Sequence, residues 1–317
     1  MSMRGIQARA LEAAPSAKPR AARRTPRGRT VEMWWAYVFV LPAVIVLGVF
    51  HLLPAAASLA ISFTDWDGLS AIQFAGWDNY AALLADDNFG KAGLHTFLYA
   101  LAVVPISVLI ATLVAVLLNA GLKGQTFYRT VYFIPVVTMS TAVGLIWKWL
   151  YNSEYGPINA VLGFLHLPQP SWLSDSRFTL ISIMIVGIWA AIGHHMIILL
   201  AGLQGIPQSF YEAASIDGAG KLRAFFRITL PLLSPSLFFV VTTSVISSLQ
   251  LFDLVFVMTG GNPALLSSAR SVVFNVYEEG FVLFRMGAAS AQAVVLFIII
   301  LLLTIVQLKL QKRWVHY

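Results

Sequence analysis

The sequence predicts an all-α membrane protein whose chain crosses the bilayer six times. Of its 317 residues, 58% are hydrophobic and only 11% are charged, whereas a soluble domain carries about 25% charged residues. The mean hydropathy of +0.78 points the same way. A soluble enzyme and a disordered chain are therefore disfavoured. The sequence contains no cysteine, which also disfavours a disulfide scaffold and a thiolate nucleophile.

Six apolar stretches are long enough to span a membrane. A spanning helix needs about 20 mostly apolar residues, because about 30 Å of hydrocarbon is crossed at about 1.5 Å per residue. We predict spans at residues 33–53, 94–118, 130–150, 178–200, 232–258 and 288–308. Several contain proline or glycine, which spanning helices tolerate when neighbours satisfy the backbone. Together the spans predict one transmembrane domain, residues 33–317, built as a six-helix bundle.

The distribution of Lys and Arg predicts the orientation of the chain. Sixteen of these residues lie in the N-terminal tail, the C-terminus and the second and fourth connections, and five lie elsewhere. Because positive residues collect on the cytoplasmic side, both termini are predicted to be cytoplasmic. The basic tail, residues 1–32, is poor in large apolar residues, so we expect it to be disordered and attracted to anionic lipid. An organelle transit peptide is an alternative interpretation of this tail.

The connection between the fourth and fifth predicted spans, residues 204–231, is too polar to enter lipid. Ser209 and Glu212 have the spacing of a capping box, which predicts the start of a short helix. Gly218 can end that helix in the left-handed conformation, and a second, basic amphipathic segment follows at 221–229. This elbow is suited to docking into a groove on another protein. The residues alone equally allow an ordinary capped helix lying on the membrane.

The same connection contains a family motif, Glu-Ala-Ala, three residues, Gly, nine residues, Ile-x-Leu-Pro. Its fixed positions are Glu212, Ala213, Ala214, Gly218, Ile228, Leu230 and Pro231. In letters and spacing the segment resembles the signature of permease subunits of bacterial binding-protein-dependent ABC importers. Shorter matches are similar to the sugar-type permeases of the maltose and glycerol-phosphate systems: Asn79-Tyr80, Gly144-Leu145-Ile146-Trp147, Thr259-Gly260-Gly261 with Pro263, and Arg285-Met286-Gly287.

This resemblance implies a coupling helix and a set of partners. The elbow would sit in a cleft of a cytoplasmic ABC ATPase, with Glu212 as the charged contact and Gly218 as the bend. The capping box stays open as a second role of Glu212, and Asp217 would either cap the second helix or contact the ATPase. The importer would contain a second homologous permease, two ATPase subunits and an extracytoplasmic solute-binding protein, all at the bacterial cytoplasmic (inner) membrane.

The chain has no ATP site of its own in this interpretation. A P-loop needs two glycines separated by four residues, followed by Lys and a hydroxyl residue. The nearest match, residues 218–222, fails in spacing and at the hydroxyl position. ATP and Mg²⁺ would therefore be bound by the partner ATPase, and we expect no cofactor and no metal in this chain.

Polar residues in the fourth and fifth predicted spans are candidates for a solute path, because sugars need hydroxyl and amide partners. Ser244 and Ser248 share a helix face, with Ser247 beside them. Adding the positions implied by the resemblance to maltose-type permeases gives the candidate set Gly187, Ala191, His194, Ser244, Ser247, Ser248 and Gln250. In that family, aromatic residues occupy the positions of His194 and Ser247.

Purely structural roles for these residues stay open. Small hydroxyl residues also mediate packing between membrane helices, and Thr242 and Thr243 are the clearest candidates for packing. His194 is equally well interpreted as a hydrogen-bonded histidine in the interior.

The sequence thus predicts the transmembrane subunit of an ATP-driven ABC importer that carries a sugar or related solute, with no catalytic residues and no nucleic-acid partner. A non-sugar solute such as glycerol phosphate is one alternative. A self-powered secondary transporter or channel is another, but it would show more intramembrane charge and inverted repeats. Asp253 is the only acid in a predicted span. A membrane-embedded enzyme would need a reactive cluster in the spans, and none is present.

Overall fold

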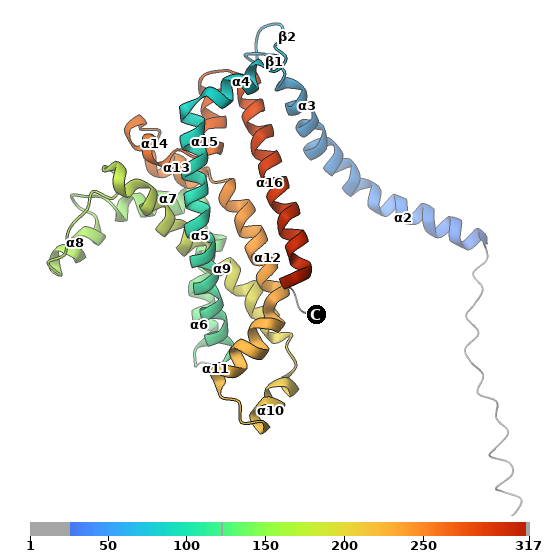
Figure 1. The fold of residues 1–317 in the computed structure, drawn as a ribbon, viewed down its shortest axis with the longest axis vertical. Coiled ribbons are helices and arrows are strands. Elements are labelled where there is room, and N and C mark those ends of the chain that lie inside the picture. Colours follow the sequence, from blue (N-terminus) through green and yellow to red (C-terminus); the bar gives the residue numbers. More distant parts are fainter. Residues whose placement is uncertain (1–25, 122, 315–317) are drawn as a thin grey trace, which may run out of the picture. The chain divides into compact units, whose positions relative to one another are not determined.

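The computed structural model describes residues 26–121 and 123–314, and most of them are helical (Figure 1). The chain divides into two compact units, Met1–Ala56 and Ala57–Tyr317. This division falls inside the first long helix, whereas the sequence suggested a boundary after residue 32. Residues 1–25 of the tail lie outside the described part of the chain, so the expectation of disorder there stays a prediction.

The first candidate span begins in the first unit, and its last residues, 57–61, belong to the second. Helix α2 (Pro26–Leu47) continues through a π-helical turn, η1 (Gly48–Leu52), into helix α3 (Leu53–Ile61). Residues 26–32, predicted to belong to a disordered tail, are therefore helical. Proline suits the first turn of a helix, because the N–H that it lacks has no partner there. The stretch Met33–Ile61 is long and apolar enough to cross a membrane, and it ends well beyond the predicted residue 53.

The fifth span also contains a π-helical turn, and its start differs from the prediction. Helix α11 (Lys221–Ala224), the turn η2 (Phe225–Thr229) and helix α12 (Leu230–Leu249) form one long helix. In η2 the N–H of Leu230 donates to the carbonyl of Phe225, directly before Pro231. In an α-helix a proline ring collides with the carbonyl of the residue four positions earlier, which for Pro231 is Arg227. The wider π-helical turn relieves this collision. The predicted second helix of the elbow is therefore the beginning of the fifth span.

Four long helices form the centre of the second unit: α5 (Asp87–Asn119), α9 (Ser176–Gln204), α12 and α16 (Met286–Trp314). Helix α5 packs on α9, α12 packs on both, and α16 packs on α12 (Figure 1). Glycine permits the closest approaches. A Cβ at Gly202 would lie 2.9 Å from the Leu233 side chain of α12. Small residues at such contacts are typical of membrane bundles, where close backbone packing drives helix association.

The third predicted span, 130–150, is broken. Helix α6 (Gln125–Val137) and helix α7 (Ser140–Leu150) meet at an angle of 102°. Pro135 weakens the hydrogen bonding at the end of α6, and Thr138 has an extended backbone that ends the helix. In the described residues five helices are long and apolar enough to cross a membrane, or six if the bent pair counts as one span. The prediction of six spans therefore holds only if the bent pair of α6 and α7 is counted as one span.

The fifth predicted span, 232–258, ends earlier than expected. Helix α12 stops at Leu249, and the chain turns through Phe252 (φ −136°, ψ −60°) into the separate helix α13 (Asp253–Thr259). Asp253 is therefore the first residue of a short helix and is not an acid inside a span. Helix α13 packs against α7, where a Cβ at Gly144 would lie 2.9 Å from Val257.

The second unit has a compact cap at one end of the bundle. Strand β1 (Thr64–Asp65) pairs antiparallel with strand β2 (Gln73–Phe74) beside helix α4 (Asp78–Ala85). The side-chain amide of Asn79 donates to the carbonyls of Ser62 and Thr64, at 2.9 Å in each case. The hydroxyls of Tyr80 and Ser62 form a hydrogen bond of 2.6 Å. These bonds hold α4 against the start of the β ribbon.

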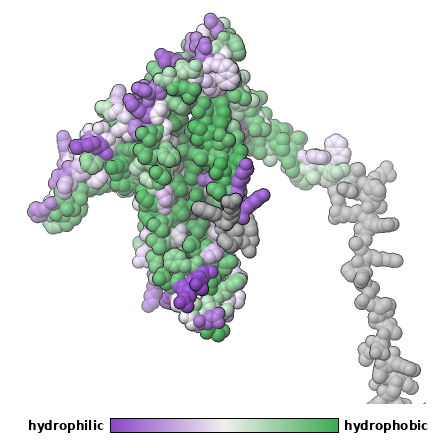
Figure 2. All heavy atoms as spheres, in the orientation of Figure 1, coloured by the Kyte–Doolittle hydropathy of each residue, from purple (hydrophilic) through white to green (hydrophobic). Residues whose placement is uncertain are grey.

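The remaining helices lie in the connections. They are α8 (Pro157–Phe164), α10 (Gln208–Ile216), α14 (Pro263–Ala269) and α15 (Val272–Tyr277), with the π-helical turn η3 (Glu278–Val282) before α16. On the face shown in Figure 2, apolar side chains cover the middle of the second unit and polar side chains gather toward its ends. This distribution is expected for a bundle surrounded by lipid.

Candidate solute cavity and coupling helix

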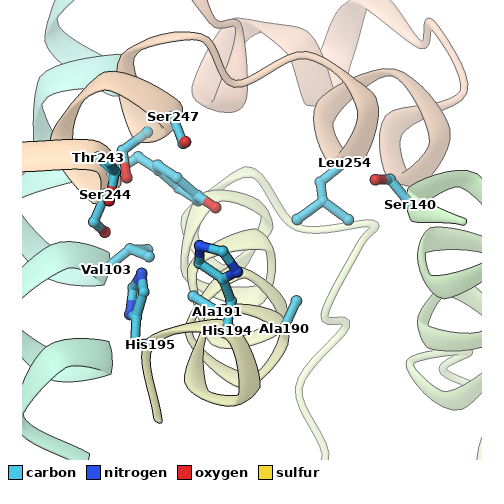
Figure 3. A pocket seen from close by; sticks show the side chains of 13 residues that line it. Val103, Ser140, Ala190, Ala191, His194, His195, Thr243, Ser244, Ser247 and Leu254 are labelled. Carbon is cyan, nitrogen blue, oxygen red and sulfur yellow. The ribbon is translucent and has the colours of Figure 1, made fainter. Parts of the chain in front are cut away.

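A polar cavity of about 330 Å³ lies between α5, α9 and α12, with α7 and α13 closing one side (Figure 3). Its lining is Tyr99, Val103, Ser140, Gly187, Ala190, Ala191, His194, His195, Thr243, Ser244, Ser247, Ser248 and Leu254. Helix α12 ends beside the cavity, and the chain is non-helical at Leu251 and Phe252. Broken helices of this kind are typical of solute sites inside transporters.

Helix α12 contributes a row of hydroxyl groups to the cavity. Ser244 and Ser248 are buried and one turn apart, and Ser247 is exposed beside them. Figure 3 shows Ser244 and Ser247 on the side of the cavity opposite His194. Thr243 also lines the cavity, although the sequence suggested a packing role for it. Its neighbour Thr242 lines a separate, mostly apolar cavity between α12 and α16.

Helix α9 contributes small residues and two histidines. Gly187, Ala191 and His194 follow helical spacing along one face and all line the cavity. His194 is exposed and has no hydrogen bond in the described part of the chain, so the interpretation as a hydrogen-bonded interior histidine was wrong. His195 is the buried member of the pair.

The structure therefore gathers six of the seven predicted path residues around one cavity. Gln250 is the exception, because α12 ends at Leu249 and leaves this side chain exposed and outside the lining. The lining residues that the sequence analysis missed are Tyr99, Val103, Ser140, Ala190, His195, Thr243 and Leu254. Among these, Tyr99 carries a sequence signal, because a tyrosine inside an apolar predicted span is a candidate for a polar contact.

The predicted coupling segment contains one well-defined helix, α10, and a glycine turn. Gly218 has φ +71°, as the left-handed cap requires. The N–H of Ala219 donates to the carbonyl of Ala214 at 2.9 Å, and the N–H of Gly218 donates to that of Ser215 at 3.1 Å. These two bonds form a complete Schellman motif. The expected left-handed end of the helix is confirmed.

Two predictions about the caps of this segment are wrong. Pro207, and not Ser209, is the N-cap residue of α10, and no side chain caps the helix. A capping box also needs a backbone N–H on the N-cap residue, which a proline lacks. Asp217 does not cap α11 either, because Gly220 is the N-cap residue of α11 and no side chain caps this helix. Asp217 and Glu212 are both exposed.

Helix α10 is fixed to the fifth span and presents apolar side chains to the outside. The hydroxyl groups of Tyr211 and Thr229 lie 3.0 Å apart and form a hydrogen bond between α10 and η2. Large apolar side chains are exposed along α10 and the start of the following helix: Phe210, Ile216, Leu222 and Phe226. Phe210 and Ile216 lie outside the candidate spans, and exposed apolar side chains in such a place are typical of surfaces that bind another protein.

A second polar cavity, of about 240 Å³, lies at the cap of the bundle. It brings Asp86, Glu279 and Arg285 together, with 3.7 Å between Arg285 Nη1 and Glu279 Oε2. Burial raises the pKa of Glu279 above its ordinary value, and the charge of Arg285 opposes this. No group of three or more His, Asp or Glu in the described chain is arranged to hold a metal ion.

Long apolar helices around a polar cavity, with a short exposed helix in a connection, define a membrane transport protein. The family described as "Binding-protein-dependent transport system inner membrane component" matches residues 80–316, and the chain belongs to this family. It is an integral multi-pass membrane protein and the permease subunit of an ABC importer.

Relatives support this assignment over most of the chain. The probable ABC transporter permease YesP of Bacillus subtilis is 35% identical over 89% of this chain and 91% of that protein. The multiple sugar-binding transport system permease MsmF of Streptococcus mutans is 33% identical over 90% and 98%, respectively. The sn-glycerol-3-phosphate transport system permease UgpA of Agrobacterium fabrum is 32% identical over 89% and 96%.

Solved structures support the fold. A chain of the bacterial alginate ABC transporter, solved with a periplasmic protein bound to alginate pentasaccharide, superposes with a TM-score of 0.79. It is 20% identical, and the match covers 89% of this chain and 95% of that chain. The type I permease fold predicted from the sequence is confirmed.

Proposed function

We propose that this permease subunit forms the translocation path for a sugar or related polyol, and that the cavity between α5, α9 and α12 is its solute site. The observation that carries the proposal is the convergence of six predicted path residues on that cavity. The names of the relatives include a sugar-binding system and a glycerol-phosphate system. None of the residues that line the cavity, all of them in the described chain, is Lys, Arg, Asp or Glu. This favours an uncharged solute over a phosphate ester.

The coupling helix in this proposal is α10, with Glu212, Ala213, Ala214 and Gly218 in contact with a cytoplasmic ATPase. The exposed apolar side chains of α10 and its bond to the fifth span support this role. One chain has one such helix, so a symmetric pair of ATPases needs a second homologous permease. ATP and Mg²⁺ would be bound by the ATPases, whose closure would bias the permease pair toward its outward-open state. An extracytoplasmic binding protein would deliver the solute.

We expect α10 and both termini to be cytoplasmic, with the chain in the inner membrane. Single cysteines in this cysteine-free chain at Ser209, Leu69 and Ala264 test the topology, because all three side chains are exposed. A membrane-impermeant maleimide added to intact cells should label the variants at Leu69 and Ala264. The variant at Ser209 should react only after the cells are opened. Labelling of the Ser209 variant from outside would show that the orientation and the coupling role are both wrong.

Filling the cavity should block transport. Ser244→Leu and Ser247→Leu each place a bulky side chain in the space that the solute needs. We expect uptake to fall about 10-fold or more, which corresponds to a loss of about 1.4 kcal/mol in binding free energy. Thr242→Leu is the matched control. Thr242 lies on the same helix, but it faces the apolar cavity of about 610 Å³, and its hydroxyl is buried without a partner in the described chain.

The measurement is ATP-dependent sugar uptake by the reconstituted importer, together with recovery of the assembled complex. The solute-site proposal requires assembled Ser244 and Ser247 variants with low uptake and a control close to wild type. Equal losses in all three variants, accompanied by loss of assembly, would show that these residues serve helix packing.

A further inference from the structure

Tyr99 is the largest polar side chain on the cavity wall, and no role has been assigned to it so far. It lies on α5, it is only 5% exposed, and it lines the cavity. Its hydroxyl makes no hydrogen bond within the described chain. The hydroxyl is not one of the fully enclosed side-chain atoms that lack a partner, so it is open to the cavity. Such a group in a native structure is expected to meet a partner that arrives from outside the chain.

Gly187 of α9 makes room for this tyrosine. A Cβ added at Gly187 would overlap the Tyr99 hydroxyl and lie 2.9 Å from Tyr99 Cζ. Its φ is not in the left-handed region, so glycine is needed here for space and not for backbone conformation. The resemblance to maltose-type permeases placed Gly187 on the solute path. The structure gives a physical reason for that placement, because the residue allows the aromatic hydroxyl of the facing helix to reach the cavity.

A second polar side chain on the same wall also lacks a partner. His195 is 4% exposed, and its Nδ1 is enclosed without a hydrogen bond in the described part of the chain. Tyr99 and His195 come from different helices and line the same cavity. A cavity of about 330 Å³ has room for a small polyhydroxylated molecule. His195 Nδ1 is enclosed and out of reach of a solute, whereas the Tyr99 hydroxyl opens to this space without a partner in the described chain. A ligand that supplies a hydroxyl group would give it one.

We propose that Tyr99, seated on Gly187, is a specificity-determining residue that hydrogen-bonds a hydroxyl group of an uncharged sugar or polyol in the cavity. The proposal rests on the proposed solute site and names one contact within it. A site that hydrogen-bonds a substrate hydroxyl rejects analogues that lack it, because the buried protein group is then left unpaired. Tyr99 would therefore contribute to discrimination between sugars as well as to their uptake.

The competing interpretation is that Tyr99 serves only packing. Its ring belongs to a buried cluster with Val103, Ile183 and Val186, so the aromatic ring does contribute to the core. Phenylalanine would satisfy that role completely. Tyr151 of the same cluster is the matched control, because it is also buried, but its hydroxyl donates to the carbonyl of Ser182 and does not line the cavity.

The test uses the complete importer in proteoliposomes, with its second permease, ATPases and binding protein. The probes are glucose, maltose, raffinose and glycerol 3-phosphate, and then the monodeoxy analogues of the sugar that the wild type takes up fastest. For that sugar, Tyr99→Phe should lower the uptake efficiency about 2- to 10-fold, the range expected for one neutral hydrogen bond. It should also reduce discrimination against one of the deoxy analogues. Tyr151→Phe should leave that discrimination unchanged.

Gly187 supplies a second, independent measurement. Gly187→Ala should lower uptake more than Tyr99→Phe does, because the added methyl group displaces the whole ring. The same alanine should cost less in the Tyr99→Phe background, where the overlap with the hydroxyl is gone and only the closer ring contact of 2.9 Å to Cζ is left, so the two effects should not add.

The outcomes separate this inference from the proposed function. A wild-type importer that takes up no sugar of the panel contradicts both. A wild type that transports sugar, with unchanged uptake and discrimination in Tyr99→Phe, contradicts only the role of Tyr99. Equal losses in the Tyr99 and Tyr151 variants, without a change in discrimination, contradict the role of Tyr99 in specificity.

Discussion

Replacing Gly218 with threonine is expected to abolish coupling between ATP hydrolysis and transport, while the helix bundle stays assembled. Gly218 has φ +71°, where a β-branched residue is strained. Nothing lies within 4 Å of the position of an added Cβ, so the substitution creates no clash with a neighbour. The cost is a backbone strain of about 1–3 kcal/mol. Relieving that strain would break the Schellman bonds that set the direction of the chain after α10.

Gly220→Thr is the matched control for this prediction. Gly220 also has open space around it, but its backbone is extended (φ −67°, ψ 162°), and threonine is about as good as glycine at an N-cap position. Substrate-stimulated ATP hydrolysis and uptake should fall at least about 10-fold in Gly218→Thr, the equivalent of about 1.4 kcal/mol, and stay near wild type in Gly220→Thr. If both variants stimulate the ATPase normally, the conformation of this turn is irrelevant to coupling.

Apolar composition predicted which segments are long helices, because about 20 apolar residues without charge have few other stable arrangements in lipid. It did not predict the breaks. Pro135 precedes the 102° bend between α6 and α7, yet Pro105 lies inside the unbroken helix α5. A proline therefore shows where a helix can bend, and tertiary contacts decide whether it does. The end of α12 at Leu249 was hidden within a mostly apolar run, in which Gln250 and Asp253 are the only polar residues that follow before Thr259.

The candidate site was predictable only where its residues share one helix. Ser244, Ser247 and Ser248 follow helical spacing, so their convergence could be read from the sequence. Tyr99 could not be placed beside Gly187, because their contact depends on how closely α5 approaches α9. Two glycines in the segments that resemble sugar-type permeases have similar explanations. Gly287 permits close contact with the backbone of Thr64, and Gly144 permits contact with α13.

Glu212→Gln is expected to weaken association with the ATPase strongly. The structure removes the capping role that the sequence had left open for Glu212, because α10 starts at Gln208 behind a proline. The side chain is exposed and makes no hydrogen bond or ion pair in the described chain, so the substitution leaves this subunit's own fold unchanged. If Glu212 pairs with a charge on the ATPase, its loss leaves that charge unpaired in the interface. Such a truncation costs about 2–5 kcal/mol, which is more than 10-fold in affinity.

Ser209→Ala is the control on the same helix, because Ser209 is exposed and caps nothing. Co-purification of the ATPase with the permease, measured at low and at raised salt, separates the two variants. Glu212→Gln should lose the ATPase at both salt concentrations, and Ser209→Ala should retain it as the wild type does. The salt comparison also indicates where the contact lies, since an exposed pair at the rim is screened by salt whereas a buried pair is much less so. ATPase retention by Glu212→Gln equal to that of Ser209→Ala would mean that the charge at position 212 makes no contact with the ATPase. The exposed apolar residues Phe210 and Ile216 would then have to supply the docking surface.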